Sequence, residues 1–292
     1  GTAMAEEVPA TAEAPAAEGT PQETRAPEAS ASPAPPASPE LEKAPDPSAA
    51  ESVQPEVSSS AAPAADMAVM ALEEDEGLGA LSLAADGEYT LISSPDDLLA
   101  VMKDPSYWTA KLKVTAPIDM SGITTAQPIG SGATPFSGTF DGNGQTISNL
   151  TITSSTGYTG LFGHITGAVQ DVVLKGAEIT DTNESYTKGM GILAGYNKGT
   201  VSGCKVTDSS LSVRYSYAGG AVGNNEGIIT NSSVTGSTVT SESAATMGYT
   251  GGFAGYNNKT VSQCYVSGGT VQFTGTNGRG TEIGGFVGRN SN

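Results

Sequence analysis

The stretch GILAGYNKGTVSGCKV, residues 191–206, returns sixty residues later as GGFAGYNNKTVSQCYV, residues 251–266. Two more units follow the same pattern, GLFGHITGAVQDVVL from Gly160 and GGAVGNNEGIITNSSV from Gly219, and a fifth begins at Gly284 as GGFVGRNSN. One glycine in each opening recurs at similar intervals, and these anchor glycines are Gly163, Gly195, Gly223, Gly255 and Gly288. A period of about 30 residues indicates stacked structural repeats.

Each unit has the composition of short β-strands separated by turns. Val, Ile and Thr occur in bursts between Gly, Asn and Ser, and no unit holds a helical apolar period that is long enough for a helix. We therefore predict an all-β solenoid in which one unit forms one coil and equivalent side chains stack in columns. The predicted columns contain Val169, Val172 and Leu174; Val201, Cys204 and Val206; Ile229, Ser232 and Val234; and Val261, Cys264 and Val266.

Glycine and asparagine hold fixed places in the repeat. The paired glycines suit tight corners, where a side chain would collide with the neighbouring coil or where φ must be positive. Asn197, Asn225, Asn257 and Asn290 each follow an anchor glycine at the second position. Their side chains can cap turns or stack as an amide ladder, and the sequence leaves both roles open.

The two cysteines, Cys204 and Cys264, occupy the same position in units that are two coils apart. Strands of neighbouring coils lie about 4.8 Å apart, so the two residues should be separated by about 9.6 Å. A disulfide requires a Cα separation below about 7 Å. We predict that both cysteines stay reduced and buried, in one column with Val172 and Ser232.

The first 86 residues differ sharply in composition from the repeats. They contain 17 acidic and 2 basic residues, 12 of the 17 prolines and no aromatic residue. Such a segment buries too little apolar surface to offset its conformational entropy, so we predict a disordered acidic tail over residues 1–86. This tail is either a stalk that holds the folded domain away from a surface or a solvated terminus without a function. Its opening, GTAM, is typical of an expression scar.

Residues 87–120 are predicted to cap the open first coil, because an uncovered sheet edge invites aggregation. The alternation in residues 87–93 predicts a strand. A helix should follow, with Ser94 as its N-cap, Pro95 in its first turn and Asp97 placed to bind free amides. Residues 121–292 then form the solenoid, which breaks off inside the fifth repeat, so the natural protein is expected to continue.

The charge balance argues against two classes of partner. Residues 87–292 hold 14 acidic and 11 basic residues, without the clustered Lys and Arg that nucleic acid and anionic membranes require. No stretch approaches the roughly 20 apolar residues of a membrane span.

A family resemblance enters at FSGTFDGNGQTISNLTI, residues 136–152, followed by GLFGHITGAVQDVVL and its copies. These residues resemble the GLUG motif of bacterial surface proteins, which include the non-catalytic region of IgA-specific metallo-endopeptidases. The resemblance covers about residues 87–292. It implies a right-handed parallel β-solenoid on a secreted or cell-wall-anchored bacterial protein. It does not imply one activity, because the motif also occurs in adhesin-like proteins.

Candidate catalytic and metal-binding residues are sparse. The chain has one histidine, His164, so neither the metalloprotease motif H-E-x-x-H nor a two-histidine zinc site can be built. We interpret His164 as a solvent-facing corner residue. The run Asp141-Gly142-Asn143-Gly144 opens like a calcium loop, but Thr146 and Ile152 stand where the loop needs Gly and Glu. The remaining acids are scattered, and we predict no catalytic residue, metal or cofactor in this chain.

The variable segments between the units form the candidate binding face, since loops on one side of a solenoid often bind ligands. We select Tyr186, Arg214 and Tyr215 as candidate ligand-facing residues, although the two tyrosines suit a structural role equally well. Tyr158, Tyr217 and Tyr249 each stand two positions before an opening glycine, and we interpret them as a structural stack.

Three functions remain in view. The leading one is a non-catalytic module for adhesion or ligand presentation, with a host protein such as immunoglobulin, or a surface glycan, as its partner. The second is the substrate-positioning N-terminal region of an IgA-cleaving zinc metalloprotease whose catalytic domain lies downstream. The third is a glycan-cleaving enzyme, because parallel β-helices include such enzymes, but it lacks a visible cluster of acids.

Overall fold

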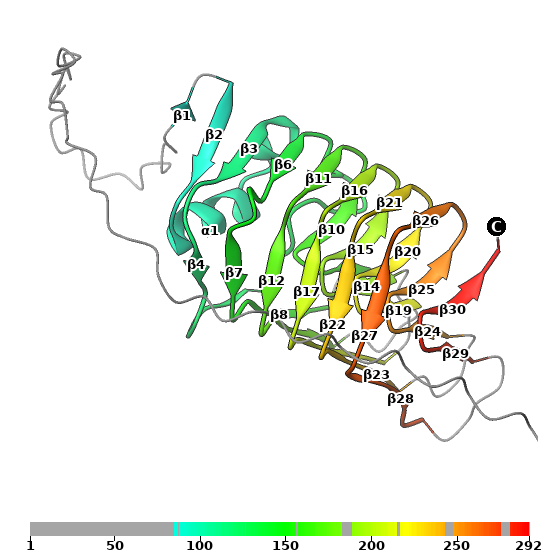
Figure 1. Ribbon diagram of the computed structural model, residues 1–292. Helices are drawn as coiled ribbons and strands as arrows, with labels where there is room; N and C mark the ends of the chain where they lie inside the picture. Colours follow the sequence, from blue (N-terminus) through cyan, green and yellow to red (C-terminus); the bar gives the residue numbers. More distant parts are fainter. Residues whose placement is uncertain are drawn as a thin grey trace, which may run out of the picture. The chain divides into compact units, whose positions relative to one another are not determined.

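A computed structural model describes residues 85–86, 88–125, 127–155, 157–182, 189–214, 217–242, 248–275 and 281–291, all within the unit Glu73–Asn292. The predicted disordered tail, residues 1–86, lies outside the described residues except for Ala85 and Asp86, and it stays a prediction. The described part is a solenoid of short strands stacked side by side (Figure 1).

Three parallel sheets form the outer walls of the solenoid. Sheet I contains β2 (Tyr89–Ile92), β3 (Lys111–Val114), β6 (Thr139–Asp141), β11 (Ala168–Gln170), β16 (Thr200–Ser202), β21 (Ile228–Thr230) and β26 (Thr260–Ser262), and β1 (Ala85–Asp86) joins it antiparallel to β2. Sheet II contains β4 (Ile118–Asp119), β7 (Thr146–Ser148), β12 (Val173–Lys175), β17 (Lys205–Thr207), β22 (Ser233–Thr235) and β27 (Tyr265–Ser267). Sheet III contains β5 (Thr124–Thr125), β8 (Thr151–Ser154), β13 (Glu178–Asp181), β18 (Ser210–Val213), β23 (Thr238–Ser241) and β28 (Thr270–Phe273).

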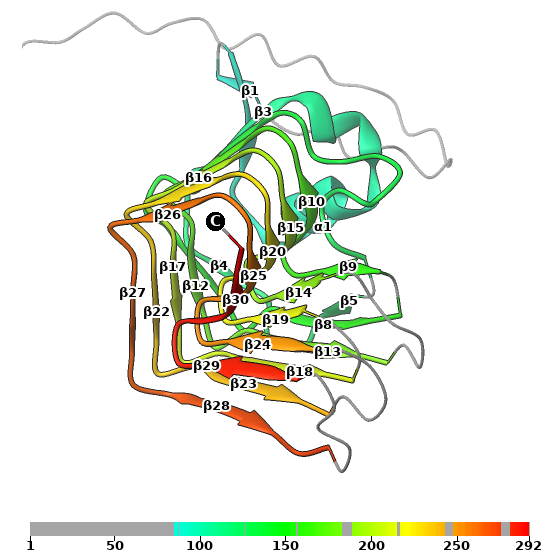
Figure 2. The ribbon, with the colours of Figure 1, turned by 90° about the vertical axis from the view of Figure 1, so that its right-hand side faces the viewer.

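Two further parallel sheets return the chain to the start of the next coil. Sheet IV contains β9 (Tyr158–Thr159), β14 (Gly189–Gly191), β19 (Tyr217–Gly219), β24 (Tyr249–Gly251) and β29 (Glu282–Gly284). Sheet V contains β10 (Phe162–Ile165), β15 (Ala194–Asn197), β20 (Val222–Asn225), β25 (Ala254–Asn257) and β30 (Val287–Asn290). Viewed from the C-terminal end, the chain runs counter-clockwise through sheets I, II and III as it approaches the viewer (Figure 2). The solenoid is therefore right-handed, as the GLUG resemblance implied.

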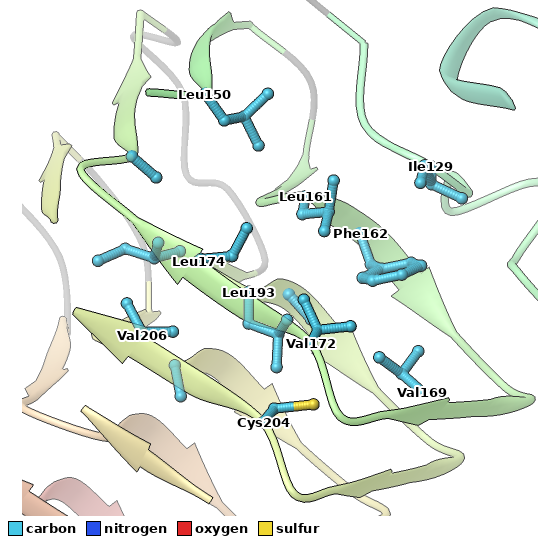
Figure 3. Packing of buried hydrophobic residues seen from close by; sticks show 14 of the residues in the cluster. Ile129, Leu150, Leu161, Phe162, Val169, Val172, Leu174, Leu193, Cys204 and Val206 are labelled. Carbon is cyan, nitrogen blue, oxygen red and sulfur yellow. The ribbon is translucent and has the colours of Figure 1, made fainter. Parts of the chain in front are cut away.

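The strand register confirms that one repeat forms one coil. Coils 1 to 5 begin at β6, β11, β16, β21 and β26, and each passes once through all five sheets. Val169 pairs with Val201, Val201 with Ile229, and Ile229 with Val261. Figure 3 shows Val169, Val172, Leu174, Cys204 and Val206 turned into the shared apolar core. These are the columns that the repeat predicted.

The anchor glycines lie inside strands and not at corners, which corrects the sequence interpretation. All five occupy sheet V, and at Gly195, Gly223, Gly255 and Gly288 the backbone comes very close to sheet IV of the preceding coil, whereas Gly163 comes close to Gly130. A Cβ on Gly223 would sit 2.2 Å from the amide nitrogen of Met190. Collision is therefore the reason for these glycines. Positive φ occurs instead at the two corners that flank sheet II, at Asn143, Gly144, Asp171, Gly203, Asn231 and Gln263, and at Asn149, Gly176, Asp208, Gly236 and Gly268.

Asn197, Asn225 and Asn257 perform both of the roles that the sequence left open, and Asn290 takes part in the ladder. Nδ2 of Asn197 donates to Oδ1 of Asn225, and the same bond runs from Asn225 to Asn257 and from Asn257 to Asn290. The donor–acceptor distance is 2.8 Å in each of the three bonds. The same side chains also bind the turn that follows them, for example where the Gly199 amide donates to Asn197 Oδ1 at 3.1 Å. A buried amide ladder thus runs along the solenoid. One side chain can take part in both the ladder and a turn because its amide has two N–H donors and an oxygen that can accept two hydrogen bonds.

The N-terminal cap contains the predicted helix. In α1 (Pro95–Lys103), the hydroxyl of Ser94 accepts from the Asp97 amide at 3.2 Å. The 3₁₀ helix η1 (Pro105–Thr109) carries Trp108, whose ring nitrogen donates to the carbonyl oxygen of Val101 at 2.8 Å. The strands β3 and β4, which lie in the range predicted as the cap, already pair with solenoid strands β6 and β7. Cap and first coil therefore overlap.

Both cysteines are free thiols that share a column, with Ser232 between them. Cys204 is buried as predicted, and burial raises the pKa of its thiol to about 12. Cys264 is only half-buried, which corrects the prediction for that residue. It lies beside β27, the edge strand of sheet II, so no described coil covers its outer side.

Candidate functional site

The connections between sheets III and IV form one edge of the solenoid, which we call the III–IV edge. In coils 2 to 5 these connections occupy positions 182–188, 214–216, 242–248 and 274–281, so the second is the shortest and the last is the longest. The interval between successive anchor glycines changes in step with them. It is shortest from Gly195 to Gly223, across the short connection, and longest from Gly255 to Gly288, across the long one.

The two changes are equal in size. The connection 214–216 is four positions shorter than 182–188, and the interval from Gly195 to Gly223 is shorter than the interval from Gly163 to Gly195 by the same four. The connection 242–248 restores the first length, and 274–281 adds one position to both quantities. In coils 2 to 5 the rest of the coil therefore has a constant length, and the variation in length is confined to this edge, whereas coil 1 also has two extra positions at the corner between sheets I and II, residues 142–145.

The candidate binding residues belong to this edge. Tyr186 and Tyr215 lie outside the described residues, and their roles stay predictions. Arg214 directly follows β18 and is exposed, and its Nε lies 3.8 Å from the carboxylate of Glu242, which follows β23 in the next coil. Both side chains are about half exposed, so the ion pair contributes at most about 1 kcal/mol. Arg214 therefore lies on the III–IV edge, in one of the variable segments from which the candidate residues were selected.

Aromatic side chains fill the re-entrant corner between sheets IV and V. Tyr217 stacks on Tyr249 with ring centres 4.9 Å apart, and Tyr256 of sheet V lies against both rings. In the first two coils Tyr158 stacks on Tyr196 at 5.0 Å. The predicted stack of Tyr158, Tyr217 and Tyr249 is confirmed for Tyr217 and Tyr249, whereas Tyr158 is separated from them by Gly189 in the sheet IV column and stacks on Tyr196 instead.

His164 is buried, which contradicts the prediction of a solvent-facing corner residue. It lies within β10, is 9% exposed, and stacks on Tyr196 with ring centres 4.6 Å apart. Burial lowers the pKa of His164, and the nearby Lys198 ammonium lowers it further, against smaller opposing effects of the Ser131 backbone and Glu226. The imidazole is therefore favoured in its neutral form.

A polar group that the sequence did not reveal borders this ring stack. The Lys198 ammonium lies 5.1 Å from the ring centre of Tyr196 and 3.9 Å from the carboxylate of Glu226. Burial raises the pKa of the Tyr196 phenol, and its hydrogen bond to Glu226 raises it further. The repeat alignment could have revealed this ion pair, since Lys198 and Glu226 hold the same position in successive units. The two residues become neighbours only when each unit is taken as one coil of a stack.

The stack contains a histidine, a tyrosine, a lysine and a glutamate, so its capacity for acid–base chemistry must be considered. Both nitrogens of His164 are shielded from solvent, and the Tyr196 hydroxyl is engaged by Glu226. A general acid or base must come within hydrogen-bond reach of its substrate. This arrangement does not offer that reach, and the described residues hold no cluster of three or more His, Cys, Asp or Glu that could bind a metal ion. The group fits a structural role.

The comparisons with known proteins agree with the repeat architecture. A family model described as the GLUG motif matches residues 215–240, which extend from just before β19 into β23 and so cover nearly one coil. The chain carries a GLUG motif. The resemblance drawn from the sequence is thereby confirmed for this motif, which lies within the β-solenoid.

Two further similarities cover longer stretches of the chain. Halomucin from Haloquadratum walsbyi is 34% identical over an alignment of 158 residues, and the match covers 49% of this chain and 2% of halomucin. The chain therefore spans a very small part of that protein. A crystal structure of a candidate immunoglobulin A1 protease from Bacteroides ovatus is 17% identical, with a TM-score of 0.39 over 70% of this chain and 72% of that one.

Within the described residues, no helix has the length and apolar character needed to cross a membrane.

Proposed function

We propose that this chain is a non-catalytic binding module of a secreted or cell-wall-anchored bacterial surface protein, and that the III–IV edge makes the ligand contacts. The observation that carries the proposal is the constant length of coils 2 to 5 outside this edge, beside connections whose lengths differ from coil to coil. A rigid frame that varies in one place only is the usual arrangement of a repeat protein that binds through its loops.

The chemistry of the edge supports a polar, extended ligand. Residues 182–188 and 214–216 contain Tyr, Ser, Thr, Asn and Arg, which combine flat apolar rings with adaptable hydrogen bonding. Arg214 and Glu242 lie at adjacent coils on this edge and offer a donor and an acceptor to a ligand that runs along the solenoid axis. A host protein, with immunoglobulin among the candidates, or a surface glycan would match this surface.

The decisive experiment shortens one connection to a length that the protein already uses. Deletion of residues 184–187 makes the connection between β13 and β14 as short as that of coil 3, and removes Tyr186. We expect an unchanged circular dichroism spectrum and a loss of at least about tenfold in affinity, measured on a glycan array and on surfaces coated with immunoglobulin A. Arg214→Ala should weaken binding to the same ligand.

The matched control is Lys175→Ala, on the outer face of sheet II and away from the III–IV edge. It should bind as the wild type does. Equal binding by the deletion variant and the wild type would refute the proposal, and so would a loss of binding that Lys175→Ala reproduces.

A further inference from the structure

The outer face of sheet III presents two rows of small hydroxyl side chains, which we call the hydroxyl face. In β8, β13, β18 and β23 the first and third residues point outward and are exposed or half-buried. These positions hold Thr or Ser in all four strands, except for Glu178. Thr153 pairs with Thr180, Thr180 with Ser212, and Ser212 with Thr240, so the hydroxyls of successive coils lie in line.

The other two outer walls of the solenoid lack this uniformity. The outward positions of sheet I include Lys113, Asp141 and the apolar Ile228. Those of sheet II include Val173 and Lys205. Charged and apolar groups thus interrupt the hydroxyls on both walls. The hydroxyl face therefore differs from the rest of the surface in chemistry, although all three walls are built from the same repeat.

The spacing of the hydroxyl face is fixed by the sheet beneath it. Neighbouring coils lie about 4.8 Å apart, and two outward residues of one strand are separated by about 6.6 Å. The side chains add little freedom, because threonine is β-branched and holds few rotamers. Groups that are already oriented lose little entropy on binding. A regular, rigid array of this kind matches a ligand that itself repeats at regular intervals.

The charge of the surface favours a neutral ligand. The chain has a formal net charge of -18, which repels polyanions, and the outward positions of β8, β13, β18 and β23 hold no Lys or Arg to attract them. A hydroxyl group both donates and accepts hydrogen bonds, as the hydroxyls of a sugar do. The methyl group of each threonine can also contact the C–H groups of a sugar ring. These properties together fit a neutral polysaccharide.

The hydroxyl face is continuous with the III–IV edge. Arg214 and Glu242 stand two residues beyond Ser212 and Thr240, so they hold the next outward positions of their coils. The Glu242 amide still donates to the Val213 carbonyl oxygen at 2.8 Å, which extends the sheet pairing to this point. Because Arg214 and Glu242 form an ion pair with each other, the border between the two surfaces is locally neutral.

We propose that the hydroxyl face binds a neutral, extended, β-linked polysaccharide that lies along the solenoid axis, with about one sugar residue to each coil. In such a polymer each hexose advances the chain by nearly the height of one coil, so successive sugars meet equivalent hydroxyls. The inference rests on the proposed function only for the premise that this chain is a binding module. It adds the class of the ligand and a second surface beside the III–IV edge.

Titration calorimetry of the intact chain with soluble oligosaccharides tests the proposal. The probes are cellohexaose, mannohexaose and xylohexaose, which are neutral, extended and β-linked. We expect at least one of them to bind. Maltohexaose is the matched control ligand, because it has the composition of cellohexaose but its α-linkages make the chain curve away from a flat surface. It should bind at least about tenfold more weakly than the best β-linked probe.

A double variant assigns the binding to the hydroxyl face. Thr180→Val with Ser212→Ala removes two neighbouring hydroxyls and keeps the strands apolar inside and compact outside. Affinity for the bound oligosaccharide should fall about tenfold, because two hydrogen bonds are lost. The matched control is Ser202→Ala with Thr230→Val, which makes the same chemical change in two paired residues on the outer face of sheet I. It should bind as the wild type does, and both variants should keep the circular dichroism spectrum of the wild type.

Three results would overturn the proposal. The first is no binding of any of the three β-linked probes, even if immunoglobulin A binds. The second is equal affinity for maltohexaose. The third is equal weakening by the sheet III and sheet I double variants.

Deletion of residues 184–187 separates this proposal from the proposed function. Binding that is lost on the deletion but kept by the sheet III variant would refute the hydroxyl face and leave the III–IV edge in place. The reverse pattern would refute the role of the III–IV edge alone.

Discussion

The two ends of the solenoid are built from the same repeat but differ in what covers them. At the N-terminal end Phe140 and Ile147 are fully buried beneath the incomplete coil of β3, β4 and β5. At the C-terminal end the equivalent residues, Val261 and Val266, are partly exposed. The columns are continuous, so the difference shows that a coil gains its stability from its neighbours and little from itself, as expected of a one-dimensional stack.

The largest expected effect concerns one column of phenylalanines. Phe253 is fully buried and stacks on Phe286 with ring centres 5.0 Å apart, whereas Phe286 is only partly buried. Phe253→Ala should lower the free energy of unfolding by about 3–5 kcal/mol, and Phe286→Ala by less than half of that. Urea denaturation measures both. Equal losses would mean that the two ends are equally well packed.

The glycine column gives a prediction of the next size. Gly220→Ala places a methyl group 2.1 Å from the Gly252 carbonyl oxygen, and backbone must move to accept it. We expect a loss of about 1–3 kcal/mol in unfolding free energy. Gly285→Ala, two coils further on, meets no atom within 4 Å and should be nearly neutral. Thermal denaturation of both variants tests the pair, and a damaging Gly285→Ala would contradict the comparison.

The amide ladder allows a similar contrast. Asn225→Ala removes the central member and leaves Asn197 and Asn257 with unpaired groups in the core, at a cost of about 1–3 kcal/mol. Asn290→Ala removes only the terminal acceptor and should cost well under half as much, because the end of the ladder is exposed to water. Chemical denaturation distinguishes the two, and similar losses would show that the ladder does not act through burial.

The smallest effect is a dependence on pH that originates in His164. Because its folded pKa is lowered, the unfolded chain takes up a proton first as the pH falls below about 6.5. The stability contributed by neutral His164 is therefore complete above pH 6.5 and is lost as the pH falls through the folded pKa. His164→Tyr, which copies the Tyr196 position, should lose less stability than the wild type between pH 7 and pH 5. Parallel melting curves for the two chains would contradict the assignment.

The repeat sequence predicted the architecture well because the residues that stack in one column of a solenoid recur at regular intervals in the sequence. Alignment of Val169, Val201, Ile229 and Val261 was enough to define coils, core and register. The alignment wrongly assigned the anchor glycines to corners, since a glycine that is required to avoid a steric collision cannot be distinguished in sequence from one that is required in a turn. The corner positions were harder to recognise in the sequence, because Asp171, Gly203, Asn231 and Gln263 share a positive φ but are four different residue types.

The candidate site was predictable only in part. The variable spacing between units located the III–IV edge, and Arg214 lies on it. The sequence could not show that His164 is buried, because its burial is due to Tyr158 and Tyr196, which come from other strands. Contacts between columns depend on how sheets IV and V fold against each other, and no spacing within one unit encodes that.

The constant length of coils 2 to 5 outside the III–IV edge has a consequence for how such a chain can change over generations. A deletion of one residue within a strand would turn its side chains to the opposite face and put every column of that coil out of register. The same deletion in residues 182–188 or 242–248 would leave every column aligned. In these coils, changes of length are therefore tolerated along the III–IV edge, where the surface can be altered without risk to the fold.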